Sequence, residues 1–124
     1  MEWEILLTPE VEAFLDELYE YDPVSHQLVN QAILVLERNG PAEGRPLVDT
    51  ITSSRIANMK ELRVQHRGGP YRVLFAFDPR RTAILLIGGN KTGKGRWYKE
   101  FVPMADRLYD KHLETLRREG LLNG

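Results

Sequence analysis

The chain has 124 residues, 42% apolar residues, no cysteine and a formal net charge of −1. This length predicts one domain over residues 1–124, and the lack of cysteine excludes a disulfide scaffold, a thiol nucleophile and a cysteine-ligated metal site. No apolar run is longer than Ala83–Ile87, whereas a membrane span needs about 20 residues, and the acidic start does not resemble a signal peptide. We therefore expect a soluble cytoplasmic protein with no membrane partner.

The N-terminal part is predicted to form a strand followed by a helical hairpin. Residues 1–7 alternate between apolar and acidic side chains, which is typical of a half-buried strand at the edge of a sheet. Thr8-Pro9 and Asp22-Pro23 each pair an N-cap residue with a proline at the first helical position. Apolar residues follow helical spacing after both signals, and Asn39-Gly40-Pro41 ends the second helix. The short link between the helices predicts an antiparallel hairpin.

The C-terminal part is predicted to form a sheet and one more helix. Residues 40–58 are turn-rich and show no period, but from Lys60 onward the apolar residues alternate. Three antiparallel strands are expected, over residues 60–67, 71–77 and 82–87, and the last is apolar on both faces, as in a central strand. A glycine-rich loop over 88–95 precedes a helix that begins at Pro103. The order predicts an α+β domain, in which an antiparallel sheet carries the helical hairpin and the C-terminal helix.

The near-zero net charge hides a strong asymmetry. Residues 1–39 carry a net charge of −8, whereas residues 60–99 carry +8, with ten basic and two acidic residues. Such a separation indicates a partner for the basic segment, often a polyanion.

Arginines on the predicted strands are the first candidate site. Alternation places Arg63 and Arg67 on one face, and the hairpin brings Arg72 of the next strand beside them. Guanidinium groups bind phosphate in bidentate geometry, which indicates a phosphate-binding face that also includes Lys60. The alternative is a solvated sheet edge, whose arginines pair with the acidic helices.

The loop after the last strand is the second candidate site. Residues 88–99 combine four glycines with four basic residues, among them Lys91, Lys94 and Arg96, and with the aromatic residues Trp97 and Tyr98. Glycines allow close approach of the backbone, basic side chains neutralise phosphates, and aromatic rings stack on splayed bases. The Gly-Lys-Ser/Thr order of a nucleotide-binding P-loop is absent. The alternative is a flexible turn that returns the two aromatic rings to the core.

The histidines do not form a metal site by their spacing. His26, His66 and His112 are isolated in the sequence, so we expect neither a metal ion nor another cofactor. His66 adjoins the basic face, and either it or His112 is a candidate for proton transfer. No serine lies in a nucleophile-elbow pattern, which argues against serine hydrolysis.

Several short motifs occur in an order and at a spacing that resemble a known family. They are Lys60-Glu61-Leu62-Arg63, the run from Pro70 to Phe75, Gly89-Asn90-Lys91-Thr92 and the tail from Trp97 to Leu113. Together they resemble the RelE/ParE superfamily of bacterial toxins, in the HigB-like branch that includes phage-derived members. The resemblance covers essentially the whole chain and implies a RelE-like fold.

The resemblance also implies an activity. Many members are toxins of type II toxin–antitoxin pairs that cleave mRNA on the ribosome without a metal, by attack of a 2′-OH on the adjacent phosphate. That reaction needs a base, an acid and cations for the phosphorane. The implied partners are mRNA, the ribosome and a cognate antitoxin, expected to be a helix-turn-helix protein of HigA type.

By position, the resemblance implies catalytic roles for Arg72, Arg63, Lys91 and Tyr98, and RNA-binding roles for Lys60, Arg67, Lys94, Arg96 and His66. Arg72 matches the arginine of the family's Tyr-Arg-Val motif, and we expect its replacement by alanine to preserve folding and abolish cleavage. Gln65 stands where relatives often carry lysine, so the general base stays open. Two alternatives also stay open: a ParE-like inhibitor of DNA gyrase without nuclease activity, and an inactive phage-derived binding module.

Overall fold

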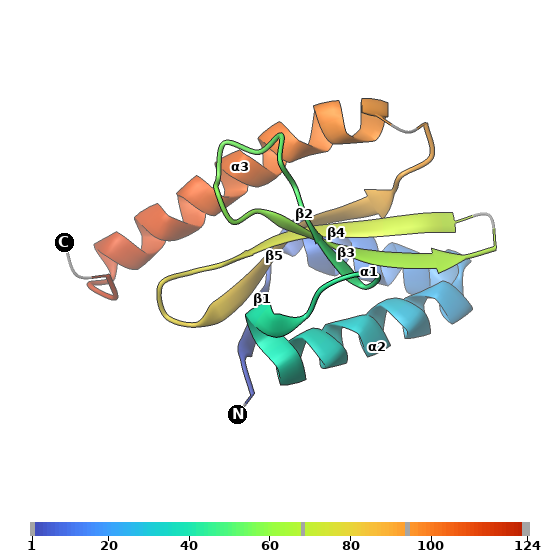
Figure 1. The fold of residues 1–124 in the computed structure, drawn as a ribbon, viewed down its shortest axis with the longest axis horizontal. Coiled ribbons are helices and arrows are strands. Elements are labelled where there is room, and N and C mark those ends of the chain that lie inside the picture. Colours follow the sequence, from blue (N-terminus) through green and yellow to red (C-terminus); the bar gives the residue numbers. More distant parts are fainter. Residues whose placement is uncertain (1, 68, 94, 123–124) are drawn as a thin grey trace.

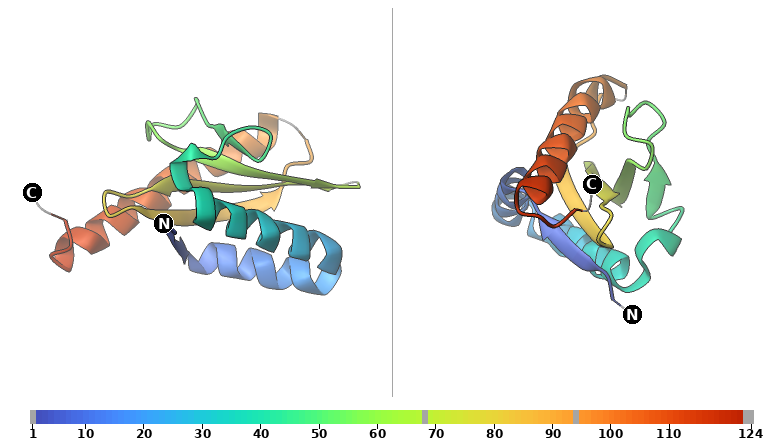
Figure 2. Two further views of the ribbon diagram at one scale, coloured as in Figure 1. Left: turned by 60° about the horizontal axis from the view of Figure 1, so that its bottom comes forward. Right: turned by 90° about the vertical axis from the view of Figure 1, so that its left-hand side faces the viewer.

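The computed structural model describes residues 2–67, 69–93 and 95–122. Its elements in chain order are β1 (Glu4–Leu7), α1 (Pro9–Tyr21), α2 (Pro23–Asn39), a 3-10 turn (Gly40–Ala42), β2 (Val48–Thr50), β3 (Lys60–His66), β4 (Gly69–Phe77), β5 (Thr82–Asn90) and α3 (Gly95–Arg118). The strands form one sheet in the order β1-β5-β4-β3-β2 (Figure 1). The helical hairpin α1–α2 covers one face and α3 covers the other (Figure 2).

The N-terminal helical hairpin is confirmed with its predicted caps. The Thr8 hydroxyl accepts a hydrogen bond from the Val11 N–H at 3.1 Å, and the Asp22 carboxylate accepts one from the Ser25 N–H at 3.2 Å. Helix α2 ends at Gly40, whose φ of 58° lies in the left-handed region that favours glycine. Local sequence signals alone therefore define both helices.

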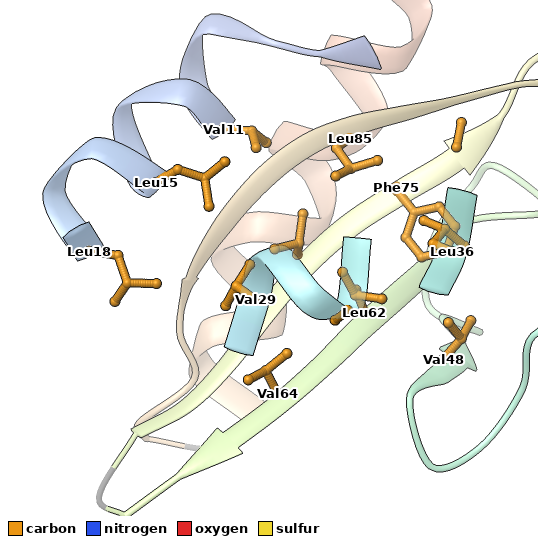
Figure 3. Packing of buried hydrophobic residues seen from close by; sticks show 13 residues of the cluster. Val11, Leu15, Leu18, Val29, Leu36, Val48, Leu62, Val64, Phe75 and Leu85 are labelled. Carbon is orange, nitrogen blue, oxygen red and sulfur yellow. The ribbon is translucent and has the colours of Figure 1, made fainter. Parts of the chain in front are cut away.

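The face under the hairpin holds the larger of the two cores. Figure 3 shows Val11, Leu15 and Leu18 of α1 packed toward the strand residues Leu62, Val64, Phe75 and Leu85. These strand residues follow the period of two, so one face of β3 and β4 is apolar throughout the contact. The alternation predicted for residues 71–77 is confirmed, because Val73 and Phe75 lie under the hairpin while Leu74 and Ala76 lie under α3.

The core under α3 is closed by the loop between β2 and β3. The Ser54 hydroxyl donates to the Asp106 carboxylate at 2.5 Å, and the Arg55 guanidinium pairs with Asp110. Both bonds fix the loop to the middle of α3. The loop thereby covers the sheet face beside the middle of α3. The end of the same face near the start of α3 carries the candidate site.

The structure differs from the predicted fold in four details. The sheet is mixed rather than antiparallel, because β1 pairs with β5 in parallel, and the short strand β2 was missed in a segment without periodicity. Strand β5 continues to Asn90 through the glycines expected to form a loop, since they extend the ladder with β4. Helix α3 begins at Gly95 rather than at Pro103, because burial of Trp97 and Val102 stabilises two turns before the proline. Pro103 has no N–H, so the carbonyl of Lys99 does not receive its helical hydrogen bond. Lys99 is exposed, so solvent can reach this part of the helix.

No helix within residues 2–67, 69–93 and 95–122 is both long and apolar enough to cross a membrane.

Candidate functional site

Two arginines face each other across neighbouring strands at the end of the sheet near the start of α3. Arg63 of β3 is in register with Arg72 of β4, and Arg72 is in register with Gly89 of β5. Their side chains lie on the α3 face, because the residues that alternate with them pack under the helical hairpin. Like charges directly opposite each other repel, so this pair requires a compensating anion.

Glu61 supplies a buried carboxylate beside Arg72. The Arg72 Nε lies 3.3 Å from Glu61 Oε1, and the two residues are only 2% and 6% exposed. The Arg72 guanidinium also donates to the Tyr71 carbonyl at 2.9 Å, whereas its buried Nε has no aligned hydrogen bond within the described structure. Arg72 is thus a buried cation held by an internal carboxylate.

Tyr98 completes the cluster from α3, the helix that covers this face of the sheet. Its hydroxyl donates to Glu61 Oε1 at 2.6 Å, so one carboxylate oxygen is shared by the phenol and the guanidinium. Burial and the bond to Glu61 raise the pKa of Tyr98 above its usual value, while nearby Arg72 lowers it less. The phenol therefore stays protonated near neutral pH and serves as a hydrogen-bond donor.

Arg63 and Lys91 form the accessible part of this cluster. The Lys91 ammonium lies 5.5 Å from the centre of the Tyr98 ring, in cation–π geometry. Half-buried Arg63 adjoins a hollow of about 260 Å³ that is lined by Pro46, Leu47, Arg63 and Gln65. The Arg63 Nε is buried, and it has no hydrogen-bond partner in the described part of the chain. We call Glu61, Arg63, Arg72, Lys91 and Tyr98 the basic site.

Two of the other residues predicted to bind RNA, Lys60 and His66, lie on the opposite face of the sheet. Lys60 and His66 have the opposite strand parity from Arg63: Lys60 Nζ lies 3.4 Å from the Thr50 hydroxyl, and His66 Nδ1 lies 3.2 Å from Ser25 Oγ. The predicted alignment of Arg67 with Arg63 is wrong, since β3 ends at His66 and Arg67 has a φ of 51°. Arg96 is exposed in the first turn of α3, and Lys94 lies outside the described residues.

His112 is also remote from the basic site. Its Nε2 lies 2.9 Å from the Asp78 carboxylate at the turn between β4 and β5, which is the opposite end of the sheet. Asp78 also accepts hydrogen bonds from the N–H groups of Arg80 and Thr82. This contact therefore ties α3 to a turn, which is a structural role. Within the three described ranges, no three His, Asp or Glu side chains lie close enough to hold a metal ion.

Glu61 is the member of the basic site that the sequence analysis did not single out. It is one of only two acids among residues 60–99, and it shares its strand parity with Arg63. An acidic residue at that position in a basic strand was therefore the signal in the sequence that could have indicated a role for Glu61 in the site. Its link to Tyr98 was not visible, because it depends on where α3 begins.

Comparisons with known proteins agree on one family. A family model described as "Phage derived protein Gp49-like (DUF891)" matches residues 16–110. The "Putative toxin HigB2" of Mycobacterium tuberculosis is 48% identical over 108 residues, covering 86% of this chain and 54% of HigB2, so the chain spans about half of that relative. The "Putative toxin HigB3" of the same organism is 46% identical over 112 residues, covering 90% of this chain and 94% of HigB3.

A solved structure shares the fold. The E. coli toxin RelE, as the R81A/R83A mutant in the free state, superposes with a TM-score of 0.55 at 10% identity, covering 83% of this chain and 97% of RelE. At this identity the likeness concerns the fold alone, and it confirms the predicted RelE-like α+β architecture. The family model and the two relatives show that the chain belongs to the HigB-containing Gp49-like family of phage-derived proteins.

Proposed function

We propose that the chain is the toxin of a type II toxin–antitoxin pair and that it acts as an endoribonuclease on translated mRNA. Two relatives at 46% and 48% identity carry the name of toxin, and the fold is that of RelE. The cleavage itself is inferred from the basic site. The observation that carries it is the registered pair Arg63 and Arg72: among the described residues Glu61 forms an ion pair with Arg72, and Asp49, which is near enough to act on Arg63, is itself paired with Arg45.

The excess charge of this pair favours an anionic ligand. Glu61 compensates Arg72 from within, and the carboxylate nearest to Arg63 on the next strand, Asp49, is paired with Arg45. Arg63 and Lys91 therefore remain for a phosphate that approaches from the hollow beside Arg63. Guanidinium groups donate two parallel hydrogen bonds to phosphate oxygens, and they stabilise the extra charge of a phosphorane. In this arrangement Arg63 contacts the phosphate, while Arg72 acts behind it.

The proposed reaction breaks one P–O bond. A ribose 2′-OH attacks the adjacent phosphorus and loses its proton, the bond to the 5′-oxygen breaks, and that oxygen is protonated as it leaves. Tyr98 is the hydroxyl donor of the basic site and shares its proton with Glu61. This pair of groups is suited to pass a proton between the attacking and leaving oxygens, and Arg72 keeps the carboxylate in place.

An antitoxin is the expected protein partner. We propose that a helix-turn-helix protein of HigA type, with an acidic surface, covers the basic site or distorts it. Complementary charge would accelerate their association and make its rate fall with salt.

The activity is tested in a translation extract to which the purified chain is added. We expect primer extension to detect new ends on translated transcripts, and Arg63→Ala to lower cleavage by at least about a hundredfold, as for loss of a group that stabilises transition-state charge. Arg117→Ala is the matched control, since Arg117 is exposed in the last turn of α3. Translation that the wild-type protein stops while the mRNA stays intact, or equal cleavage by Arg63→Ala, would contradict the proposal.

A gyrase inhibitor is the second candidate function. It is favoured by the burial of Arg72, because at 2% exposure this guanidinium does not reach a ligand without movement of its neighbours. A supercoiling assay separates the two functions. Inhibition of gyrase together with intact mRNA would support this second function.

A further inference from the structure

A trough beside the basic site is separate from it in its lining. Its volume is about 760 Å³, and it lies between α1, the end of β5 and the start of α3. It is lined by Glu10, Ala13, Phe14, Glu17, Leu18 and Tyr21 of α1, by Asp22 and Tyr71, by Ile87–Asn90 of β5, and by Phe101 of α3. The basic site shares none of these residues.

One margin of the trough is an open sheet edge. Strand β1 pairs with β5 only from Thr82 to Leu85 and then turns into α1, whereas β5 continues to Asn90 (Figure 1). The Lys91 N–H donates to the Pro70 carbonyl at 2.8 Å, toward β4. By alternation along the strand, the N–H and C=O groups of Gly88 and Asn90 point the other way, into the trough. Such an edge is a template for another strand.

The faces of β5 are closed at this level, so only its edge is accessible. A Cβ placed on Gly88 would lie 2.6 Å from the Phe14 ring of α1, and a Cβ on Gly89 would lie 2.9 Å from the Trp97 ring of α3. The two helices therefore contact the strand directly from both sides. A ligand of this trough meets backbone groups at the edge and side chains on the two walls.

The walls of the trough are acidic and apolar. Three carboxylates line it, those of Glu10, Glu17 and Asp22, and its lining contains no basic residue. Asp22 is engaged, since it accepts a hydrogen bond from the Tyr71 hydroxyl at 3.0 Å, but Glu10 and Glu17 are exposed on α1. The charge of these carboxylates repels phosphate and attracts a basic ligand.

We propose that the trough binds an extended basic segment of a partner protein, which adds to the open edge of β5 as a strand. The backbone of such a segment pairs with Gly88 and Asn90, its lysine or arginine side chains meet Glu10 and Glu17, and its alternate apolar side chains contact Phe101. Charge complementarity selects a basic segment, and the open edge selects an extended one over a helix.

The proposal is tested by selecting random nine-residue peptides, displayed on phage, against the full chain. We expect the enriched peptides to alternate Lys or Arg with apolar residues. The best peptide, made synthetically, should bind the Glu10→Lys/Glu17→Lys variant at least about tenfold more weakly. It should bind the matched variant Glu12→Lys/Glu20→Lys as it binds the wild type, because these exposed residues of α1 lie outside the trough and carry the same charge change.

A second readout reports on the strand. Amide hydrogen exchange of Gly88 and Asn90 should slow by at least about tenfold when the peptide binds, because their N–H groups become hydrogen-bonded. The proposal would be overturned by enriched peptides without a basic excess, by equal binding to both double variants, by unchanged exchange at these amides, or by no enrichment. None of these outcomes depends on RNA cleavage, so the two proposals are tested separately.

Discussion

The buried pair of Arg72 and Glu61 gives the sharpest prediction about stability. Replacing Arg72 by methionine keeps much of the side-chain volume and leaves Glu61 as an uncompensated charge at 6% exposure. For charges separated by 3.3 Å, an effective dielectric constant of about 20 gives an attraction of about 5 kcal/mol. Breaking a buried pair from one side costs about 3–5 kcal/mol in other proteins. We therefore expect Arg72→Met to lower the free energy of unfolding by about 3–5 kcal/mol.

A double-mutant cycle measures this interaction. Urea denaturation at pH 7 gives the free energy of unfolding for the wild type, Arg72→Met, Glu61→Gln and the double variant, with a common m-value as the check on two-state behaviour. The glutamine still accepts from the Tyr98 hydroxyl, so the double variant should be more stable than Arg72→Met, with a coupling of at least about 2 kcal/mol. A cost below about 1 kcal/mol for Arg72→Met, or additive effects, would refute this reasoning.

This burial revises the expectation that Arg72→Ala preserves folding. Loss of cleavage in that variant would not separate a chemical role from loss of structure. Arg63 is half-buried beside an open hollow, so its replacement is the cleaner test of phosphate binding.

The remaining predictions concern titration and packing. Because its pKa is raised, Tyr98 should form phenolate only above the usual pKa of 10.0. The stability that its hydroxyl contributes should be present at lower pH and be lost as pH rises through the raised pKa. Ultraviolet titration of the wild type against Tyr98→Phe measures this ionisation, and a Tyr98 that ionises at the usual pKa would contradict the prediction. The pKa of Asp22 is lowered by the hydrogen bonds from Ser25, so its carboxylate contributes stability that the wild type loses as pH falls below 3.8. Asp22→Asn should lack this contribution. Urea midpoints of the two proteins that fall in parallel below that pH would contradict the prediction. Gly88→Ala should lower the free energy of unfolding by about 1–3 kcal/mol through the contact with Phe14, whereas Gly44→Ala, with nothing within 4 Å, should change it by under about 0.5 kcal/mol; equal urea midpoints for the two variants would contradict this.

The elements that the sequence predicted well are those specified by local signals. Both helices of the hairpin follow from a capping residue, a proline and an apolar stripe, and their bounds agree with the structure. The alternation in β4 likewise predicts which side chains face each helix layer. In these elements a few neighbouring residues supply the whole stabilising pattern, so the chain can be interpreted without its tertiary contacts.

The elements that were predicted less well depend on distant partners. The parallel pairing of β1 with β5 joins residues at opposite ends of the chain, and no local period reports it. The early start of α3 depends on burial of Trp97 against the sheet, which outweighs a proline within the helix. Tertiary burial overrides local preference at both places.

The candidate site was predicted in part: the neighbouring arginines were expected, and their buried contacts were not. The sequence placed Arg63 beside Arg72, and the register confirms it, because alternation and a tight turn determine hairpin neighbours. It did not predict that Arg72 is buried or that Glu61 bridges Arg72 to Tyr98. Those contacts arise between a strand and a helix, and a charge count along the chain carries no information about them.

The separation of charge also has a structural consequence. Part of the acidity of residues 1–39 lies along α1 beside the trough, whereas the basic site lies on the α3 face of the sheet. The fold thereby presents surfaces of opposite sign, which the two proposals assign to different partners. The net charge of −1 is thus compatible with the proposed RNA-binding site and with the proposed site for a basic protein segment.

The chemistry of the cleaved RNA end tests the central proposal most directly. A transcript translated in an extract that contains the purified chain is recovered, and its new 3′ ends are analysed by mass spectrometry. Attack by the 2′-OH predicts a 2′,3′-cyclic phosphate, which is lost with Arg63→Ala and retained with Arg117→Ala. Translation that stops while the transcript stays intact, or new ends that carry a 3′-hydroxyl, would contradict the proposed reaction.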